Sequence, residues 1–243
     1  MKFSLSDFLT GDFDPELQTA LKDIEAFPAH LIHCMLSGPP RSGKTSILLQ
    51  YAYKAAMRGQ QVVLLCHRDK MEQTHPTLPQ GVHKASPFWQ RVQLRYLPTS
   101  QELQKYAACL HLAPTPPNVI IVDDLSEFML SRPTDKRSRE AELIKTLAML
   151  HEATASLHRL NASGQPCLLL ISDAGGGEGP KSLYILERWC PLILTTQNAE
   201  GKLTLSALPA MAEKHLLHPS CFCQLHFSLT THSALTLEGL SWP

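Results

Sequence analysis

Short apolar runs recur along the chain, and polar or proline-rich segments separate them. The runs at 31–36, 61–66, 118–122 and 166–172 are apolar at most positions, which is typical of strands buried on both faces of a parallel sheet. The segment 91–97 alternates between apolar and polar residues and predicts a fifth strand. Because helices are expected between these strands, the pattern favours an α/β fold with a mostly parallel central sheet flanked by helices.

Four further segments carry apolar residues at helical spacing. The expected helices span residues 15–24, 45–57, 99–112 and 141–160. Asp14 is placed to cap the first helix, with Pro15 at its first position. Thr99 and Glu102 have the spacing of a capping box at the start of the third helix.

The carboxyl-terminal part of the chain has a different pattern. Strands are expected at 191–197, 202–208 and 221–229, and the last two alternate clearly. Alternation is typical of antiparallel strands with one solvated face, so we expect a C-terminal antiparallel extension of the sheet. Residues 1–30 are expected to be a lead-in with one helix, which covers the sheet or docks on a partner. Residues 31–240 are expected to form the main domain.

Three irregular segments interrupt the regular elements. Residues 67–90 contain several prolines, residues 131–140 are polar with four cations against two anions, and residues 173–181 are rich in glycine. Such compositions predict loops at all three places.

Composition narrows the class of protein without identifying it. The chain has 243 residues, 44% of them hydrophobic, which allows one large α/β domain or two small ones. Lys plus Arg and Asp plus Glu both total 22, so any contact with nucleic acid needs a local basic patch. The first residues lack the apolar stretch of a signal peptide, no run approaches membrane-spanning length, and the seven cysteines are scattered. We therefore expect a soluble intracellular protein with reduced thiols and no membrane contact.

The strongest chemical signal is the segment 38–45, which fits the pattern G-x-x-x-x-G-K-[ST] of a phosphate-binding loop. The nucleotide-binding residues expected there are Gly38, Pro39, Pro40, Arg41, Ser42, Gly43, Lys44 and Thr45. The glycines let successive backbone N–H groups turn toward phosphate oxygens, and the following helix directs its positive end at the same anion. Lys44 supplies an ammonium for the outer phosphates, and Thr45 supplies a hydroxyl for Mg²⁺. The expected strand before the loop and helix after it are the context that the motif requires.

An acidic pair follows one of the buried strands. The run from Asn118 to Val122 leads directly into Asp123 and Asp124. An acid at the carboxyl end of a strand beside the phosphate loop can hold Mg²⁺ through water, so we assign Asp123 to the metal together with the threonine of the loop. The expected catalytic residues are Lys44, Asp123 and Asp124.

A second group of residues has a spacing that could ligate zinc: His215, His218, Cys221 and Cys223. The two cysteines fall on the apolar face of the strand expected at 221–229. We therefore interpret them as core residues.

With these motifs the chain resembles the RecA-type recombination ATPases, specifically the eukaryotic recombinase paralogues. The shared features are Arg41 before Ser-Gly-Lys-Thr in the loop and the two strands that precede the strand of Asp123. The basic loop, long helix, strand, glycine-rich loop and terminal hairpin then follow in the same order. Within that family the chain is similar to the small ATPase that partners a SWIM-type zinc-finger protein in the animal Shu complex.

The resemblance implies a RecA-like ATPase domain that binds ATP and Mg²⁺ and acts in homologous-recombination DNA repair. It also implies a SWIM-type zinc-finger partner, the recombinase and its paralogues as further partners, contact with single-stranded DNA, and a nuclear location. The segments 131–140 and 173–181 occupy the places of the family's two DNA-binding loops. The residues expected to contact DNA are Arg132, Lys136, Arg137, Arg139 and Lys181. From the sequence alone, the cations of 131–140 favour a solvated loop before a helix, and only the family position makes contact with DNA equally well supported.

Two positions depart from the recombinase pattern. Recombinases end the strand after the phosphate-loop helix with a Glu that activates water, whereas this chain has His67 and Arg68 there. Arginine stays protonated and cannot act as a base, which leaves Asp124 or Glu72 as alternatives. Asp173 stands near the place of the glutamine that senses the γ-phosphate in recombinases. Both departures predict weak hydrolysis, with ATP largely a structural ligand. Together with the resemblance, we expect a weak, DNA-stimulated ATPase.

Two other functions are compatible with the same motifs. A small-molecule kinase shares the phosphate loop, and the cationic loop 132–139 could serve as its lid, although the terminal strand pair does not suit that fold. A nucleotide-bound scaffold that never hydrolyses ATP carries the same loop as well. Release of phosphate with and without single-stranded DNA separates the three functions.

Overall fold

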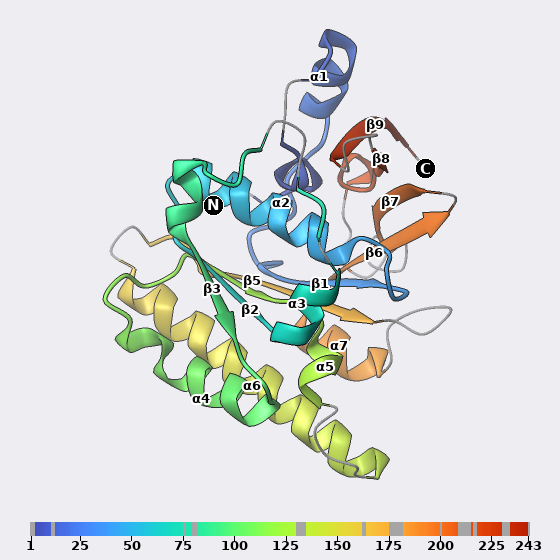
Figure 1. The fold of residues 1–243 in the computed structure, drawn as a ribbon. Coiled ribbons are helices and arrows are strands. Elements are labelled where there is room, and N and C mark those ends of the chain that lie inside the picture. Colours follow the sequence, from blue (N-terminus) through green and yellow to red (C-terminus); the bar gives the residue numbers. More distant parts are fainter. Residues whose placement is uncertain are drawn as a thin grey trace.

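The protein is described by a computed structural model that covers residues 3–10, 13–74, 76–78, 82–129, 135–161, 164–174, 182–199, 201–208, 215, 218–229 and 234–242. Within this part of the chain, one nine-stranded sheet has the strand order β3-β2-β4-β5-β1-β6-β7-β8-β9. Helices cover both faces of the sheet (Figure 1). The predicted fold class is confirmed.

Six strands form the parallel part of the sheet. They are β1 (His33–Gly38), β2 (Val62–Cys66), β3 (Val92–Tyr96), β4 (Val119–Val122), β5 (Leu168–Ala174) and β6 (Leu192–Ala199). β1 lies between β5 and β6, so that Cys34 is paired with Leu170 on one side and Leu192 on the other. Side chains of β1, β2 and β4 are buried along their whole length, which explains why these strands read as continuous apolar runs.

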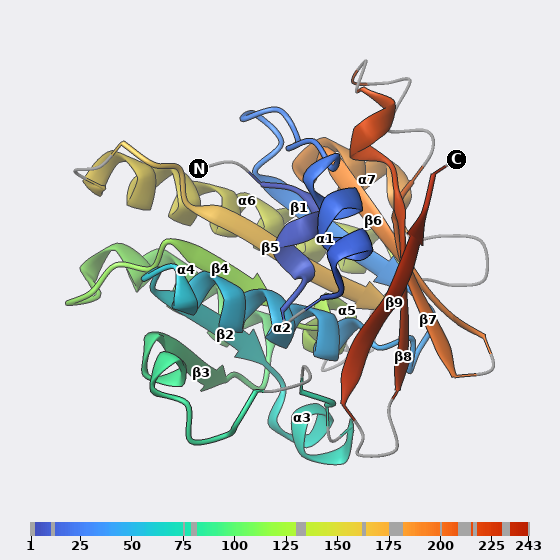
Figure 2. The ribbon, with the colours of Figure 1, turned by 90° about the horizontal axis from the view of Figure 1, so that it is seen from above.

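Three strands continue the sheet in antiparallel fashion: β7 (Lys202–Ala207), β8 (Gln224–Leu229) and β9 (Leu235–Ser241). Figure 2 shows them along one margin of the sheet, beyond β6. The antiparallel extension is confirmed, whereas β9 was not predicted. Its register with β8 shifts between His226 and Phe227, and Gly239 weakens the alternation that signals a strand.

The longer helices lie where the apolar spacing placed them. α2 (Lys44–Met57) covers one face of the sheet, and α4 (Ser100–Cys109) and α6 (Lys136–Leu160) cover the other (Figure 1). One boundary prediction is wrong: α6 begins at Lys136 rather than at residue 141, because Asp135 caps it by accepting a hydrogen bond from the Ser138 backbone N–H (2.8 Å).

Several short elements were not predicted. They are α3 (Arg68–Thr74), α5 (Leu125–Met129), α7 (Leu183–Trp189) and the 3₁₀ turns Leu5–Phe8, Pro87–Arg91, Leu110–Leu112 and Pro219–Cys221. Each is about two turns or less, which is too short for a helical period to emerge from a pattern of residues. The expectation of an irregular segment over 67–90 is thus wrong at its start, where α3 lies.

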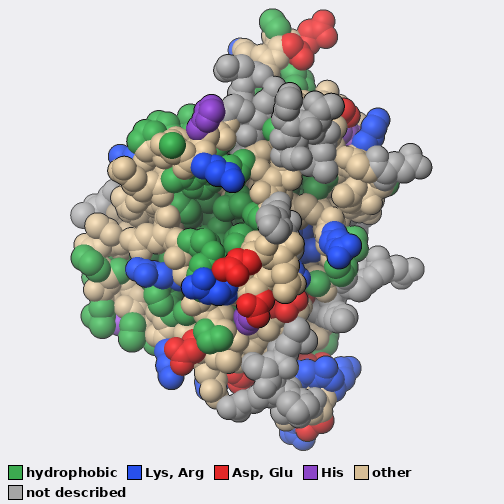
Figure 3. All heavy atoms as spheres, viewed as in Figure 1, with side chains coloured by type: hydrophobic (Ala, Val, Ile, Leu, Met, Phe, Trp, Pro, Cys, Tyr) green, Lys and Arg blue, Asp and Glu red, His purple; other side chains and the backbone are tan. Residues whose placement is uncertain are grey.

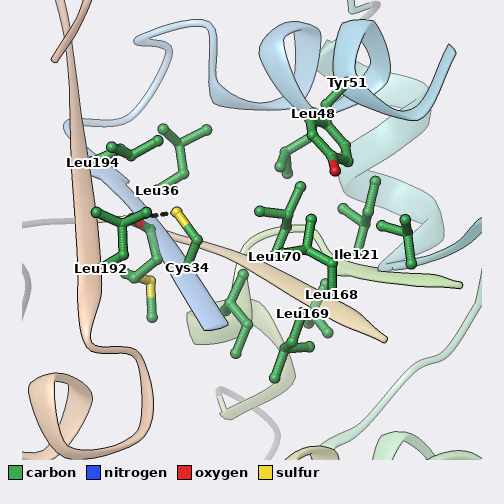
Figure 4. Close-up of a cluster of buried hydrophobic side chains, with 14 of the residues drawn as sticks. Cys34, Leu36, Leu48, Tyr51, Ile121, Leu168, Leu169, Leu170, Leu192 and Leu194 are labelled. Carbon is green, nitrogen blue, oxygen red and sulfur yellow. Dashed lines mark hydrogen bonds between the residues drawn. The ribbon is translucent and has the colours of Figure 1, made fainter. Parts of the chain in front are cut away.

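The core lies on both faces of the sheet, and the part that supports the phosphate loop lies between α2 and the parallel strands. Figure 4 shows Leu48 and Tyr51 of α2 above Ile121 of β4 and Leu170 of β5, all of them buried. On the other side of the same cluster, Cys34 and Leu36 of β1 meet Leu192 and Leu194 of β6. The phosphate loop connects β1 to α2, so this packing holds both of its ends.

The lead-in is anchored by a short turn rather than by its helix. α1 (Pro15–Lys22) has no fully buried residue, although Leu17 and Leu21 pack partly buried against the core; Figure 1 shows it beyond the end of α2. Phe3 and Phe8 are instead buried against Tyr51 of α2, with ring centroids 5.8 Å and 5.1 Å from the tyrosine ring. The first residues therefore belong to the same core as the phosphate-loop helix.

All seven cysteines are free thiols, and six of them are buried. Cys221 and Cys223 lie in the core as expected, and burial raises the pKa of Cys223 to about 11. The described residues contain no group of three or more His, Cys, Asp or Glu side chains placed to hold a metal ion. Among the described helices, none has the length and apolarity needed to cross a bilayer.

Candidate nucleotide-binding site

The phosphate loop lies at the carboxyl end of a central strand. β1 ends at Gly38 and α2 begins at Lys44, so the loop turns the chain from a strand into a helix within six residues. The carboxyl ends of parallel strands meet at one edge of a sheet, which is where α/β proteins bind their ligands. β1, β4 and β5 bring the loop, Asp123 and Asp173 to that edge.

Both glycines of the loop are required by close neighbours. A Cβ at Gly38 would lie 2.5 Å from the backbone oxygen of Thr196 and nearer still to its hydroxyl. Gly43 has φ = 80°, and a Cβ there would overlap Leu203 of β7. Thr196 of β6 also shares a hydrogen bond with Ser42 (2.7 Å). β6 and β7 therefore hold the back of the loop, a role that local sequence patterns did not reveal.

Lys44 points into the curve of its own loop. Its Nζ donates hydrogen bonds to the carbonyl oxygens of Gly38 (2.9 Å) and Pro39 (2.8 Å). Burial lowers the pKa of Lys44, and the nearby carboxylates of Asp124 and Asp123 counteract that effect. The ammonium thus remains where the backbone of the loop and the acidic edge of the sheet converge.

Thr45 and Asp123, the two residues assigned to Mg²⁺, are in hydrogen-bond contact. The Thr45 hydroxyl donates to Asp123 Oδ2 (2.8 Å), and the Ser172 hydroxyl donates to Asp123 Oδ1 (2.7 Å). Burial raises the pKa of Asp123, while these two hydrogen bonds favour its charged form. A threonine hydroxyl beside a carboxylate is the pair that holds Mg²⁺ in phosphate-loop proteins.

Asp124 is held in an unusual backbone conformation with φ = 57°. Its N–H donates to the Ser172 hydroxyl (2.7 Å), and its Oδ2 accepts from Lys70 Nζ (2.6 Å). Its Oδ1 is buried without a hydrogen-bond partner among the described residues. An unpaired buried carboxylate oxygen is costly, so this atom fits a site that takes a hydrated cation.

Asp173 lies at the end of β5 and is nearly buried. It accepts hydrogen bonds from the backbone N–H of Ser126 (3.0 Å) and from the Ser126 hydroxyl. Burial raises its pKa, and the Ser126 hydroxyl and Lys44 act in the opposite direction. Asp173 therefore ties β5 to the turn after β4.

A cavity of about 700 Å³ opens beside the loop. Lys/Arg and Asp/Glu side chains gather near the middle of the face in Figure 3, over α3, in the part of the molecule where this cavity lies. The acidic and basic residues that line it are Arg41, Lys44, Asp69, Lys70, Asp123, Asp124 and Glu127. Leu203 of β7 and Leu235 of β9 line it as well, so the antiparallel extension contributes an apolar wall.

The two alternative bases lie in different places. Asp124 lines the cavity, whereas Glu72 is not among its described lining residues. Glu72 is exposed and accepts a hydrogen bond from Arg68 (3.1 Å). Arg68 lies over the ring of Tyr96, 4.5 Å from its centroid. His67 and Asp69 do line the cavity, although no sequence motif points to Asp69.

The residues expected to contact DNA are only partly within the described chain. Arg132 and Lys181 lie outside the described residues. Lys136, Arg137 and Arg139 are exposed in the first turns of α6, and Lys136 is 84% exposed and only 3.8 Å from Glu140. Three cations thus stand at the positive end of a helix, where the helix dipole disfavours them.

Comparison with known proteins finds two relatives that carry the same name. No protein-family model matches it. It is 33% identical to ATPase SWSAP1 of Mus musculus over 141 residues, which cover 57% of this chain and 48% of the mouse protein. It is 32% identical to ATPase SWSAP1 of Homo sapiens over 165 residues, which cover 65% of this chain and 68% of the human protein. The chain therefore spans about half the length of the mouse relative and two thirds of the human one. At this level the resemblance inferred from the sequence is confirmed, and the chain belongs to the ATPase SWSAP1 family.

Proposed function

We propose that the protein binds ATP with Mg²⁺ and acts in homologous-recombination DNA repair, with weak ATP hydrolysis. The observation that supports this most directly is the hydrogen bond between Thr45 and Asp123, at the mouth of a loop whose glycines cannot carry side chains. Bound Mg²⁺ would neutralise charge on the outer phosphates. Lys44 and the backbone N–H groups of the loop would position the phosphate chain.

Slow hydrolysis follows from the acids around the cavity. Asp123 is committed to Thr45 and Ser172, and Asp124 Oδ2 is bound to Lys70. No Glu stands at the end of β2, where recombinases place their base. ATP would then act mainly as a structural ligand that stabilises the fold by mass action, by about 2.7 kcal/mol at a hundredfold excess over Kd.

Contact with single-stranded DNA is the second part of the proposal. The cations at the start of α6 oppose the helix dipole, and a phosphate backbone would compensate that cost. The resemblance found in the sequence, together with membership of the ATPase SWSAP1 family, leads us to propose a SWIM-type zinc-finger partner, cooperation with the recombinase and its paralogues, and a nuclear location. Co-purification of the full chain with a SWIM-domain protein tests the partner directly.

Calorimetry with Mg·ATP tests the central claim. Lys44→Ala should weaken binding by about tenfold to a hundredfold, because it removes a charge-assisted hydrogen bond to phosphate. Lys105→Ala is the matched control, since Lys105 is exposed on α4 and pairs only locally with Glu102. A folded protein that takes up no ATP, or that binds it equally well with Lys44→Ala, would contradict the proposal.

The salt dependence of DNA binding tests the second part. Replacing Lys136, Arg137 and Arg139 together by Ala should flatten the slope of log K against log salt by about 0.7 for each phosphate that the protein no longer neutralises. An unchanged slope rejects these residues as the DNA-binding surface.

A scaffold that never hydrolyses ATP is the competing function. The hydrogen bond from Lys70 to Asp124 favours it, because it occupies an acid that could otherwise act as the base. A small-molecule kinase is the third candidate, and phosphate release measured with and without single-stranded DNA separates the three functions. Stimulation by DNA indicates the recombination ATPase, dependence on an added small molecule indicates a kinase, and silence under all conditions indicates the scaffold.

A further inference from the structure

One cation of the cavity has no counterpart in the phosphate-loop motif. Lys70 is the third residue of α3, and its Nζ lies 2.6 Å from Asp124 Oδ2 and 3.0 Å from Glu127 Oε1. The Lys70 side chain is 30% exposed, as is that of Glu127 at 31%, whereas the Asp124 side chain is 6% exposed. The lysine therefore bridges a buried carboxylate and a half-exposed one.

Lys70 lies on the metal side of the cavity. It lines the same cavity as Lys44 and Thr45, and it binds the residue next to Asp123, which accepts the Thr45 hydroxyl. The two ammonium groups are close enough for the charge of Lys70 to lower the pKa of Lys44. Because Mg²⁺ bridges the β- and γ-phosphates in phosphate-loop proteins, this corner is where a terminal phosphate would lie.

Two further charged residues near this corner, Asp173 and Arg68, are not placed to bind a terminal phosphate. Asp173 is an acid that already accepts two hydrogen bonds from Ser126. Arg68, the neighbouring cation of α3, is directed over Tyr96 and paired with Glu72. Lys70 is thus the α3 cation that faces the cavity.

We propose that Lys70 is a second phosphate ligand, which exchanges Glu127 for the terminal phosphate of a bound nucleoside triphosphate and so distinguishes triphosphate from diphosphate. This proposal rests on the proposed function, in which the cavity binds ATP. An ammonium carries three N–H donors, so Lys70 can keep its bond to the buried Asp124 while it turns toward the phosphate. Glu127 is the partner released at least cost, because water can solvate its half-exposed carboxylate.

Calorimetry on the full chain with Mg²⁺ tests the proposal, using a non-hydrolysable ATP analogue and ADP as probes. Lys70→Met keeps the length of the side chain and removes its charge. It should weaken binding of the analogue about tenfold, as expected when one charge-assisted hydrogen bond is removed, and change the affinity for ADP less than about twofold. Arg68→Met is the matched control on the same helix and should change neither affinity.

The ratio of the two affinities is the decisive quantity, because partial unfolding of a variant lowers both affinities together. Glu127→Gln should change the affinity for the analogue in the opposite direction. It weakens the carboxylate that competes with the phosphate for Lys70, so the affinity should rise about two- to threefold. This gain should disappear when Glu127→Gln is combined with Lys70→Met. An unchanged ratio in Lys70→Met, with normal binding of both probes by the wild type, overturns the role of Lys70 alone. A wild-type protein that binds neither probe overturns the proposed function and this proposal together.

Discussion

Two helices, α2 and α3, begin at the same edge of the sheet, and their first residues offer different chemical groups to a bound phosphate. α2 follows β1 through a loop of small residues, and its first two residues are Lys44 and Thr45, which point to the loop and to Asp123. α3 follows β2 after a single residue and begins with Arg68, Asp69 and Lys70. The start of α2 offers backbone amides and one ammonium, whereas the start of α3 offers charged side chains that are already paired.

The comparison indicates that the start of α2 supplies most of the groups expected to bind ATP, whereas any hydrolysis would depend on the start of α3. The start of α2 retains every group that a phosphate-loop site needs. At the start of α3, His67 stands where recombinases place a glutamate, and Lys70 binds Asp124, one of the acids that line the cavity. We therefore expect substitutions in the loop to lower the affinity for ATP, and substitution of His67 to change its turnover.

The largest effect is expected from restoring a base at the start of α3. His67→Glu places a carboxylate on the cavity wall, since His67 lines the cavity. A positioned general base contributes about a hundredfold or more to a rate, so steady-state release of phosphate should rise by that order. Arg68→Glu is the control, because that side chain is directed at Tyr96. Equal rates in both variants would show that the missing base is not what limits turnover.

Gly38→Ala should destabilise the phosphate loop before α2 through a steric clash. The new methyl group would meet the backbone oxygen of Thr196 at 2.5 Å, and overpacking of this kind costs about 1–3 kcal/mol of unfolding free energy. ATP binding should disappear with it. Gly239→Ala is the control, because nothing lies within 4 Å of a Cβ there. Urea unfolding compares the two, and equal stability would argue against the close approach of β6.

Asp123→Asn should separate metal binding from phosphate binding. The amide keeps the shape of the side chain and one of the two acceptor oxygens that Thr45 and Ser172 use, but it lacks the charge that Mg²⁺ prefers. The gain in ATP affinity on adding Mg²⁺ should fall by about tenfold, the size of one charged interaction. Asp14→Asn is a control that preserves a helix cap. A variant with the full Mg²⁺ effect would remove Asp123 from the metal site.

The smallest effect is expected from the pH dependence of stability. Burial raises the pKa of Asp173 in the folded state, so the folded protein binds more protons than the unfolded chain between the ordinary aspartate pKa and the raised one. Stability from this group is then highest at the acid end of that window and falls as pH rises through it. Asp173→Asn should remove that fall, so its unfolding free energy relative to wild type should be more favourable at pH 7 than near pH 4.

Asp135→Asn is the control with the opposite sign. The backbone N–H of Ser138 lowers the pKa of Asp135, so its contribution is present above the unfolded pKa and disappears on acidification. Urea unfolding at the two pH values distinguishes the variants. A parallel response of both would contradict the burial of a charged Asp173.

Much of the fold and half of the site could be predicted because their signals are local. The apolar runs of β1, β2, β4 and β5 reflect burial on both faces, and the phosphate loop carries its chemistry within eight neighbouring residues. The start of α6 was misplaced because charged residues in its first turn resemble a polar loop. Short helices such as α3 gave no period to detect.

Residue types and their spacing determine the class of fold, the phosphate loop and the acid that belongs with it. Hydrophobic period and backbone geometry act over only a few residues, so a sequence pattern can reveal them. Three-dimensional packing settles which distant groups complete the site: Thr196 and Leu203 behind the loop, Lys70 on Asp124, and Ser126 on Asp173. The hydrogen bonds among these contacts join residues that are 47 to 154 positions apart in the sequence. Their geometry depends on the order of strands in the sheet, which no short stretch of residues encodes.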